Sequence, residues 1–256
     1  MVAHSATQSG RGAPVATEGG VRVEDAGAVR TLMLDRPSRK NAFTVGMYRT
    51  MTRALAEAAK SEATSVVRLA SSSAIFCAGN DFHVMLEGSI GDVDGEEFAR
   101  GAADFYLALA AFPKPVIAEV GGLAAGAGAT LLLHCDVVVA TTTACFDFPS
   151  TRLGVLPDGG ASFLLPARVG LQRAMDWLLF GERIDVETAR EAGVVTTVVV
   201  REQLTRTVLA RADALSKLPQ DTLRQMKRLL REPFRKELEE AIVRESKAIS
   251  DSLRAR

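Results

Sequence analysis

The chain has 256 residues, 47% of them hydrophobic, which is enough for one large α/β domain with a substantial core. Its 31 lysines and arginines balance its 31 aspartates and glutamates, so the charge indicates neither a nucleic-acid-binding nor a membrane-binding surface. No apolar run reaches the roughly 18 residues of a membrane span, and no signal-peptide core is expected near the first residue.

The positions of the cysteines and histidines indicate whether the chain forms disulfides or binds a metal. Cys77, Cys135 and Cys145 lie in apolar stretches without CxxC spacing, and no histidine stands at ligand spacing from them. This pattern is typical of reduced core cysteines in a cytoplasmic protein, and it predicts no metal site. His134, within an apolar segment, is expected to be a hydrogen-bonded core residue, and Asp136 is expected to bond backbone groups where a strand begins.

Residues 1–20 are rich in Gly, Ser, Thr and Ala and are expected to form a disordered tail. Beyond them, apolar spacing separates strand-like from helix-like segments. The elements expected in the first half are a hairpin of 21–24 and 29–34 around a turn at 25–27, a helix over 44–60 with Thr44 as N-cap, strands over 65–70 and 75–82, a mobile loop over 88–96, and a helix over 98–112.

The second half continues the alternation before it changes character. Its expected elements are strands over 116–120, 136–140, 144–148 and 194–200, a loop over 149–160, helices over 161–169, 171–180 and 186–192, and helix from 202 onward. This order predicts a layered α/β core over residues 21–200 and an all-helical region over residues 201–256. The last helix is apolar along one stripe, so it either folds over its own core or packs on another subunit.

One stretch, Gly121–Asp136, joins a strand-like run to a helix-like run, Thr130–Leu133, through small residues. A helix that begins at such a turn exposes its first backbone N–H groups, which suit an anion or a developing oxyanion. Gly126, Ala127 and Gly128 would let a ligand approach the backbone closely. The alternative is that these small residues only allow the helix to pack tightly on the strand.

Four segments, in this order, resemble the crotonase (enoyl-CoA hydratase/isomerase) superfamily. They are LDRPSRKNAF at 34–43, FCAGNDF at 76–82, KPVIAEVGGLAAGAGATLLLHCD at 114–136 and FPSTRLGVLPDGGASFLLPARVG at 148–170, and FGERIDVETAREAGVV at 180–195 adds to them. The resemblance implies an α/β fold, a spiral of ββα units, followed by a C-terminal all-helical region. Through that region the subunits are expected to assemble into a homotrimer or a dimer of trimers.

The resemblance also implies an acyl-CoA thioester substrate. Its thioester oxygen would be held by two backbone N–H groups, those of Asn80 and Ala127. No separate cofactor is implied, because CoA arrives as part of the substrate. Contacts to the CoA moiety are expected from a basic loop, nearby backbone and a C-terminal helix, at Arg36, Arg39, Lys40, Ala42, Ala78, Asp81 and Lys227. Residues 88–96 are expected to help shape the acyl pocket.

The acid/base residues depart from the pattern of the hydratases in this family. Hydratases carry two glutamates where this chain has Thr130 and Ser150, and hydroxyl groups alone cannot activate a water near neutral pH. Asp158 resembles the aspartate of family members that move a double bond, such as ring-1,2-epoxyphenylacetyl-CoA isomerases and dienoyl-CoA isomerases. One buried carboxylate can take a proton from one carbon and return it to another, so isomerisation is favoured.

Other interpretations stay open at this point. Thr130, Ser150 and Asp158 could together position water in a true enoyl-CoA hydratase of fatty-acid degradation. The chain could instead bind acyl-CoA without turnover, or act as a thioester hydrolase or decarboxylase of the same family. Asp158 could also serve only as the cap of a helix that begins near Gly159 or Gly160, which is a common role for aspartate.

Overall fold

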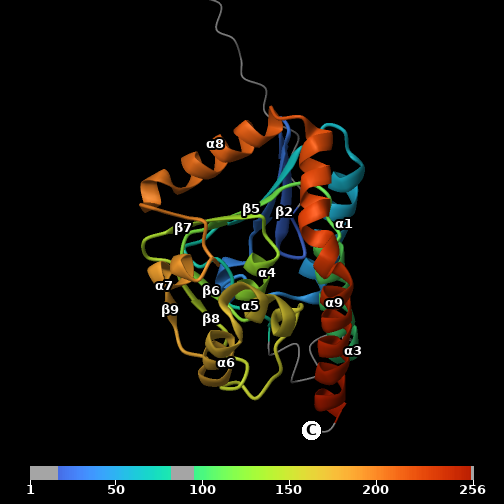
Figure 1. Cartoon of the computed structure of the whole chain (residues 1–256), viewed down its shortest axis with the longest axis vertical. Coiled ribbons are helices and arrows are strands. Elements are labelled where there is room, and N and C mark those ends of the chain that lie inside the picture. Colours follow the sequence, from blue (N-terminus) through green and yellow to red (C-terminus); the bar gives the residue numbers. More distant parts are fainter. Residues whose placement is uncertain (1–16, 82–94, 255–256) are drawn as a thin grey trace, which may run out of the picture.

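The computed structural model describes residues 17–81 and 95–254, and two β-sheets form its centre (Figure 1). The larger sheet has the order β1-β2-β3-β4-β5-β7-β10; its first three strands are antiparallel neighbours and the remaining pairs are parallel. Its strands are β1 Thr17–Glu18, β2 Val21–Ala26, β3 Val29–Leu34, β4 Val66–Ser71, β5 Val116–Val120, β7 Val137–Thr141 and β10 Thr197–Val199. The smaller sheet has the order β6-β8-β9, with β6 Leu123–Ala125, β8 Cys145–Asp147 and β9 Ile184–Asp185.

Helices surround the two sheets. They are α1 Val45–Lys60, α3 Gly95–Ala110, α4 Ala127–Leu133, α5 Ala161–Val169, α6 Leu171–Phe180, α7 Val186–Glu191, α8 Leu204–Ser216 and α9 Gln220–Arg254, with short 3₁₀ turns η1 Pro37–Arg39 and η2 Arg201–Gln203. The sequence predicted α5 and α6 with these bounds. It also predicted the N-cap of α1, where the Thr44 hydroxyl accepts a hydrogen bond from the Met47 amide.

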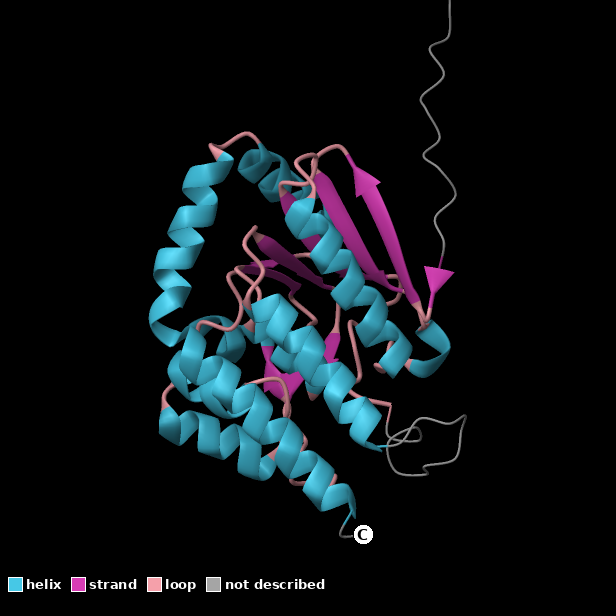
Figure 2. Ribbon diagram, turned by 90° about the vertical axis from the view of Figure 1, so that its right-hand side faces the viewer, coloured by secondary structure: helices cyan, strands magenta, loops and turns pink. Residues whose placement is uncertain are grey.

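The central strands are buried on both faces, as parallel strands usually are. In β5, Ile117 points to one face, whereas Val116 and Ala118 join the main core on the other. Helix α8 covers the Ile117 face with residues that include Val208, which is fully buried. Figure 2 shows a helical layer in front of the strands of the larger sheet. Mixed strands and helices up to β10, followed by helices alone, confirm the expected fold class.

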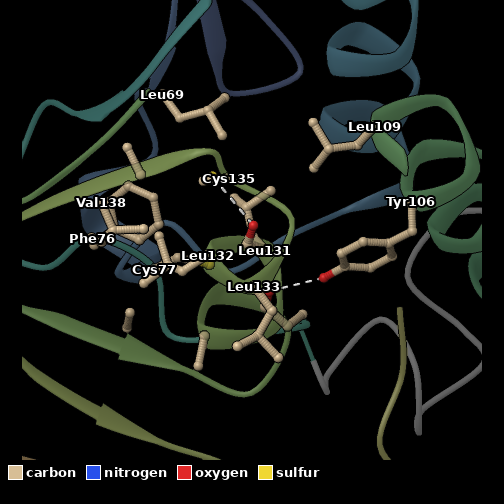
Figure 3. Packing of buried hydrophobic residues seen from close by; sticks show 14 of the residues in the cluster. Leu69, Phe76, Cys77, Tyr106, Leu109, Leu131, Leu132, Leu133, Cys135 and Val138 are labelled. Carbon is tan, nitrogen blue, oxygen red and sulfur yellow. Dashed lines mark hydrogen bonds between the residues drawn. The ribbon is translucent and has the colours of Figure 1, made fainter. Parts of the chain in front are cut away.

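The central stretch Gly121–Asp136 begins with an element that the sequence did not predict, the strand β6. Helix α4 then begins at Ala127, earlier than the expected Thr130. A Cβ atom on Gly128 would lie 2.7 Å from the Cβ atom of Cys77, so this glycine is needed for close packing. Figure 3 shows Cys77 beside the leucines of α4. Tight packing therefore accounts for Gly128.

Helix α9 folds over its own chain and runs along one side of the molecule (Figure 1). It packs against α3 and α5 and buries Leu238, Ala241 and Ile242. Its C-terminal end lies at the opposite end of the molecule from the larger sheet (Figures 1 and 2). Another part of its surface stays exposed and apolar, formed by Met226, Leu229, Leu230 and Phe234.

Three sequence predictions need correction or fall outside the described residues. The segment 75–81 is not a strand: among the described residues it pairs only through isolated bridges, Cys77 with Ala124 and Asn80 with Phe43, and the Asn41 side chain donates to the carbonyl groups of Ile75 and Phe76. Residues 17–20 of the expected tail form β1 and a turn, and residues 1–16 lie outside the described part. Most of the expected loop 88–96 lies outside it too, and α3 already begins at Gly95.

Candidate active site

A pocket that opens to solvent lies where the loop after Cys77, the N-terminus of α4 and the loop before α5 meet α3 and α9. Its walls are largely apolar, with Phe98, Phe148 and Ile242 among them. It brings together six of the residues that the sequence singled out, namely Ala78, Asn80, Ala127, Thr130, Ser150 and Asp158. Segments far apart in the sequence thus converge on one cavity.

Two backbone N–H groups belong to residues that line this pocket, Asn80 and Ala127. Neither donates to another group in the part of the chain that the structure describes. The two loops lie in contact, since a Cβ atom on Gly79 would be 3.7 Å from the Ala127 nitrogen and 3.1 Å from the Ala125 carbonyl oxygen. Gly79 has a φ of 98°, a backbone conformation that residues with a side chain rarely adopt. The close approach of the two loops therefore depends on this glycine.

Tyr106, on α3, fixes the carbonyl group of Ala127 through a hydrogen bond. The Tyr106 hydroxyl donates to the Ala127 carbonyl oxygen at 2.8 Å, and this bond is one of the dashed lines in Figure 3. Tyr106 is fully buried, and a Cβ atom on Gly159 would lie 2.6 Å from its ring. One tyrosine therefore supports both the start of α4 and the residue after Asp158.

Asp158 is 8% exposed and lies on the pocket wall. Its Oδ2 atom accepts a hydrogen bond from the Asn80 side-chain amide at 2.7 Å. Burial raises the pKa of Asp158 from 3.8 to about 6, against the opposing effect of hydrogen bonds from Asn80 and from its own backbone. Near neutral pH the carboxylate is therefore largely ionised, yet basic enough to take up a proton from a carbon acid.

The suggestion that Asp158 only caps a helix is wrong. The N-cap position of α5 belongs to Gly160, and no side chain of that segment caps it. Glu245, on α9, performs this role instead: its carboxylate accepts from the Gly160 N–H at 2.6 Å and from the Ser162 N–H at 2.8 Å. The Asp158 carboxylate is thus left to Asn80 and the pocket.

Sequence reasoning missed Glu245. It is 7% exposed, and burial raises its pKa despite the hydrogen bonds from Ser162 and Gly160. In the sequence it is one of many charged residues in the last helix, and only its place next to apolar Ile242 and Ile249 hinted at an inward position.

The comparisons with known proteins agree with this geometry. The sequence profile described as enoyl-CoA hydratase/isomerase matches residues 24–255. The chain belongs to this family, part of the crotonase superfamily. It is 37% identical over 194 residues to a 1,2-epoxyphenylacetyl-CoA isomerase of Escherichia coli, covering 75% of this chain and 74% of that protein. It is 36% identical over 200 residues to a probable enoyl-CoA hydratase of Rhodobacter capsulatus, covering 78% and 76%.

A solved structure supports the same assignment. The enoyl-CoA hydratase/isomerase of Pseudoalteromonas atlantica superposes with a TM-score of 0.84 at 30% identity, covering 91% of each chain. The enoyl-CoA hydratase/isomerase family thus accounts for the fold and for an acyl-CoA substrate. Its relatives carry both the isomerase and the hydratase name, so the reaction has to be argued from the site.

Within this enoyl-CoA hydratase/isomerase site, Thr130 and Ser150 are buried and both line the pocket. Neither hydroxyl has a hydrogen-bond partner among residues 17–81 and 95–254. The two groups are therefore available to a bound molecule. Of the described residues that line the pocket, Asp158 alone carries a carboxylate.

The residues expected to bind CoA are spread more widely. Arg39 and Lys40 are exposed at the end of η1, and Ala42 follows them in the same loop. Arg36 donates to the Ala42 carbonyl oxygen at 3.1 Å and to the Asp81 carboxylate at 2.6 Å, so Asp81 is buried in an ion pair and does not line the pocket.

Lys227 and Asp136 belong to a separate cluster. The Lys227 ammonium donates to Asp136 at 2.6 Å and to the Lys114 carbonyl at 2.7 Å, and it does not line the pocket. Burial lowers the pKa of Lys227 to about 8. Asp136 accepts from the Val116 amide at 2.8 Å, as the sequence predicted.

His134 is only half satisfied, contrary to expectation. Its Nε2 atom bonds the Gly159 carbonyl oxygen at 2.7 Å, whereas Nδ1 is buried without a partner among the described residues. Burial lowers the pKa of His134 to about 4, so the ring is neutral near pH 7 and donates through Nε2.

Among the described residues, no helix combines the length and apolar character that a bilayer crossing requires.

Proposed function

We propose that this protein is an enoyl-CoA isomerase that converts a 3-enoyl thioester into the conjugated 2-enoyl form. The observation that carries the proposal is a pocket with one carboxylate among its described residues, Asp158, next to the unpaired N–H groups of Asn80 and Ala127. A proton shift between two carbons requires one base that also acts as an acid, together with stabilisation of the enolate.

The proposed mechanism uses these groups in turn. The N–H groups of Asn80 and Ala127 bind the thioester oxygen, which makes the C2 proton more acidic. Asp158 removes that proton, and the electron pair moves onto the oxygen as a dienolate. Asp158 then delivers the proton to C4, and the double bond forms between C2 and C3. The composition of the substrate is unchanged, and no water takes part.

Hydration fits the pocket less well. It would require a water activated and a proton supplied by carboxylate-type groups, whereas the positions of the two hydratase glutamates hold Thr130 and Ser150. The hydroxyl groups of these residues are better suited to hydrogen-bond the acyl group than to activate water. The E. coli relative named as an isomerase supports this choice, although the R. capsulatus relative is named a probable hydratase.

The remaining site assignments are part of the same proposal. The exposed cations of Arg39 and Lys40 would meet the CoA phosphates, with the backbone near Ala42 and Ala78 along the pantetheine chain. Asp81 would contribute indirectly, through its ion pair with Arg36. For Lys227, its ion pair with Asp136 makes a contact to CoA the least supported assignment.

We also infer assembly of copies of this chain into a homotrimer or a dimer of trimers. Exposed large apolar side chains on α6 and α9 support it, because such side chains are buried when subunits associate. These side chains are Leu171, Met175, Leu179, Phe180, Met226, Leu229, Leu230 and Phe234. Light scattering of the purified protein should give a mass of three or six chains, and Leu230→Glu should reduce it. A monomeric mass for the unaltered chain would contradict the inference.

The reaction is tested by offering the protein and its Asp158→Asn variant a 2-enoyl-CoA and a 3-enoyl-CoA while following absorbance of the conjugated thioester. Gain of conjugation from the 3-enoyl substrate, lost in the variant, is the expected result. Loss of conjugation from the 2-enoyl substrate would establish a hydratase instead. Tight binding of both thioesters without any change would indicate a non-catalytic acyl-CoA-binding protein.

A further inference from the structure

Behind the pocket, two hydrogen bonds in series connect α1 to Asp158. The hydroxyl of Tyr48, on α1, donates to Oδ1 of Asn80 at 2.7 Å. The Nδ2 group of Asn80 then donates to Oδ2 of Asp158, also at 2.7 Å. Tyr48 is fully buried and Asp158 nearly so, which protects both bonds from competition with water.

The direction of this chain follows from the chemistry of its groups. An amide oxygen can only accept, an amide NH₂ can only donate and an ionised carboxylate can only accept, so Asp158 sets which way the Asn80 amide faces, and the Tyr48 hydroxyl holds the amide oxygen in that orientation. The NH₂ group is thereby turned towards the Asp158 carboxylate. The opposite orientation would place the amide oxygen against a negatively charged oxygen and lose the bond to Asp158. Tyr48 therefore acts on Asp158 through Asn80.

The two oxygens of Asp158 are consequently not equivalent. Oδ2 is engaged by Asn80, and within the described residues no other side chain donates to the carboxylate. A proton taken from substrate goes to Oδ1, the oxygen without a bond to another side chain among the described residues, while Oδ2 keeps its hydrogen bond in both protonation states. A carboxylate anchored through one oxygen can swing less, so Oδ1 stays directed at the substrate carbons.

We propose that Tyr48 and the side chain of Asn80 are positioning residues that anchor Asp158 through Oδ2, so that Oδ1 alone carries the proton between the substrate carbons. This rests on the proposed function, in which Asp158 is the base. The Asn80 side chain thus has a role distinct from that of its backbone N–H, which would hold the thioester oxygen.

The anchoring bond also affects ionisation, because a donor to a carboxylate favours its charged form. The titratable side chains that interact electrostatically with Asp158 are Tyr48 on α1, Tyr106 on α3, Cys77 and Glu245 on α9, and His134 bonds the carbonyl group of the adjacent Gly159. Burial raises the pKa values of the tyrosines and the cysteine and lowers that of His134, so all four are uncharged near neutral pH. Loss of the Asn80 amide should therefore raise the pKa of Asp158.

Two tyrosines provide a matched pair of variants. Tyr48→Phe and Tyr106→Phe each remove one hydroxyl from adjacent buried rings, whose centroids are 6.2 Å apart. Only Tyr48 is bonded to Asn80, whereas Tyr106 is bonded to the Ala127 carbonyl. Tyr106→Phe is expected to lower kcat without moving the pKa of Asp158, and Tyr48→Phe to change both.

The test is a ¹³C NMR titration of the Asp158 carboxyl, identified by its loss in Asp158→Asn, together with the pH dependence of kcat. Asn80→Ala should raise the pKa of Asp158 by about one unit and lower kcat about tenfold at little change in KM. Tyr48→Phe should raise that pKa by about half a unit, and Tyr106→Phe should leave it in place. Unchanged titration in both Asn80→Ala and Tyr48→Phe would overturn the proposal. Because the NMR titration needs no turnover, it decides this point even if no enoyl-CoA is converted.

Discussion

Replacing Glu245 by alanine should destabilise the protein through the N-terminus of α5. The change leaves the N–H groups of Gly160 and Ser162 without the acceptors that now lie at 2.6 and 2.8 Å. A buried donor without a partner costs about 1–3 kcal/mol, so two such donors would cost about 2–6 kcal/mol. Removal of a buried carboxylate, whose pKa is raised by desolvation, offsets part of this cost. We therefore expect a loss of about 2–4 kcal/mol in the free energy of unfolding.

Urea unfolding at fixed protein concentration, followed by circular dichroism, would measure this loss. Glu240→Ala is the matched control, because Glu240 is exposed on the same helix and, among the described residues, forms surface ion pairs with Lys236 and Arg244. Its midpoint should stay near that of the unaltered protein, and Glu245→Gln, which keeps one acceptor oxygen, should fall between the two. Equal midpoints for Glu245→Ala and Glu240→Ala would refute the reasoning.

Two further predictions concern Asp158 and Gly128. The Asp158 carboxyl has a pKa of about 6 in the folded protein against 3.8 as its ordinary value, so its protonated form stabilises the fold and this stabilisation is lost as the pH rises from about 4 to about 6. Asp158→Asn should therefore be inactive. Above pH 6 it should be more stable than the unaltered protein by up to about 3 kcal/mol in the free energy of unfolding, and this gain should vanish near pH 4. Equal melting temperatures of the two proteins at pH 8 would contradict this. Gly128→Ala should lower the free energy of unfolding by about 1–3 kcal/mol, because its Cβ atom would overlap Cys77. Gly101→Ala is the control, since a Cβ atom there would have ordinary contact distances inside α3 and should cause no such loss. Equal urea midpoints for the two variants would show that the contact with Cys77 does not limit stability.

Local patterns predicted the elements that local interactions determine. The apolar spacing of α1, its Thr44 cap and the Gly170 that separates α5 from α6 are all contained within short windows of sequence. The strand expected at 75–82 was wrong for a non-local reason, since the described part of this segment forms only isolated bridges and the distant Asn41 side chain binds two of its carbonyl groups. The strand β6 was missed for the same kind of reason, as its pairing with β8 is set by the tertiary fold.

The candidate site also contains residues that the sequence could identify and residues that it could not. Asn80, Ala127 and Asp158 could be found from sequence, because each stands next to glycine and within a segment that resembles the family. Their convergence on one pocket agrees with that interpretation, and the roles assigned to them stay predictions. Tyr48 and Glu245 could not be found, because a tyrosine in an apolar helix and a glutamate in a charged one look like ordinary core and surface residues.

The contribution of α9 to the pocket affects the order in which parts of the pocket form during synthesis. Ile242, Ser246 and Ile249 of this helix line the pocket, and Glu245 ties it to α5. Since a ribosome makes the chain from its N-terminus, the elements that hold Asn80, Ala127 and Asp158 can fold before the wall of their pocket exists. Residues of α9 therefore complete the pocket only after the segments that carry Asn80, Ala127 and Asp158 have been made, so a nascent chain that has not yet reached α9 presents Asp158 without this wall of the cavity.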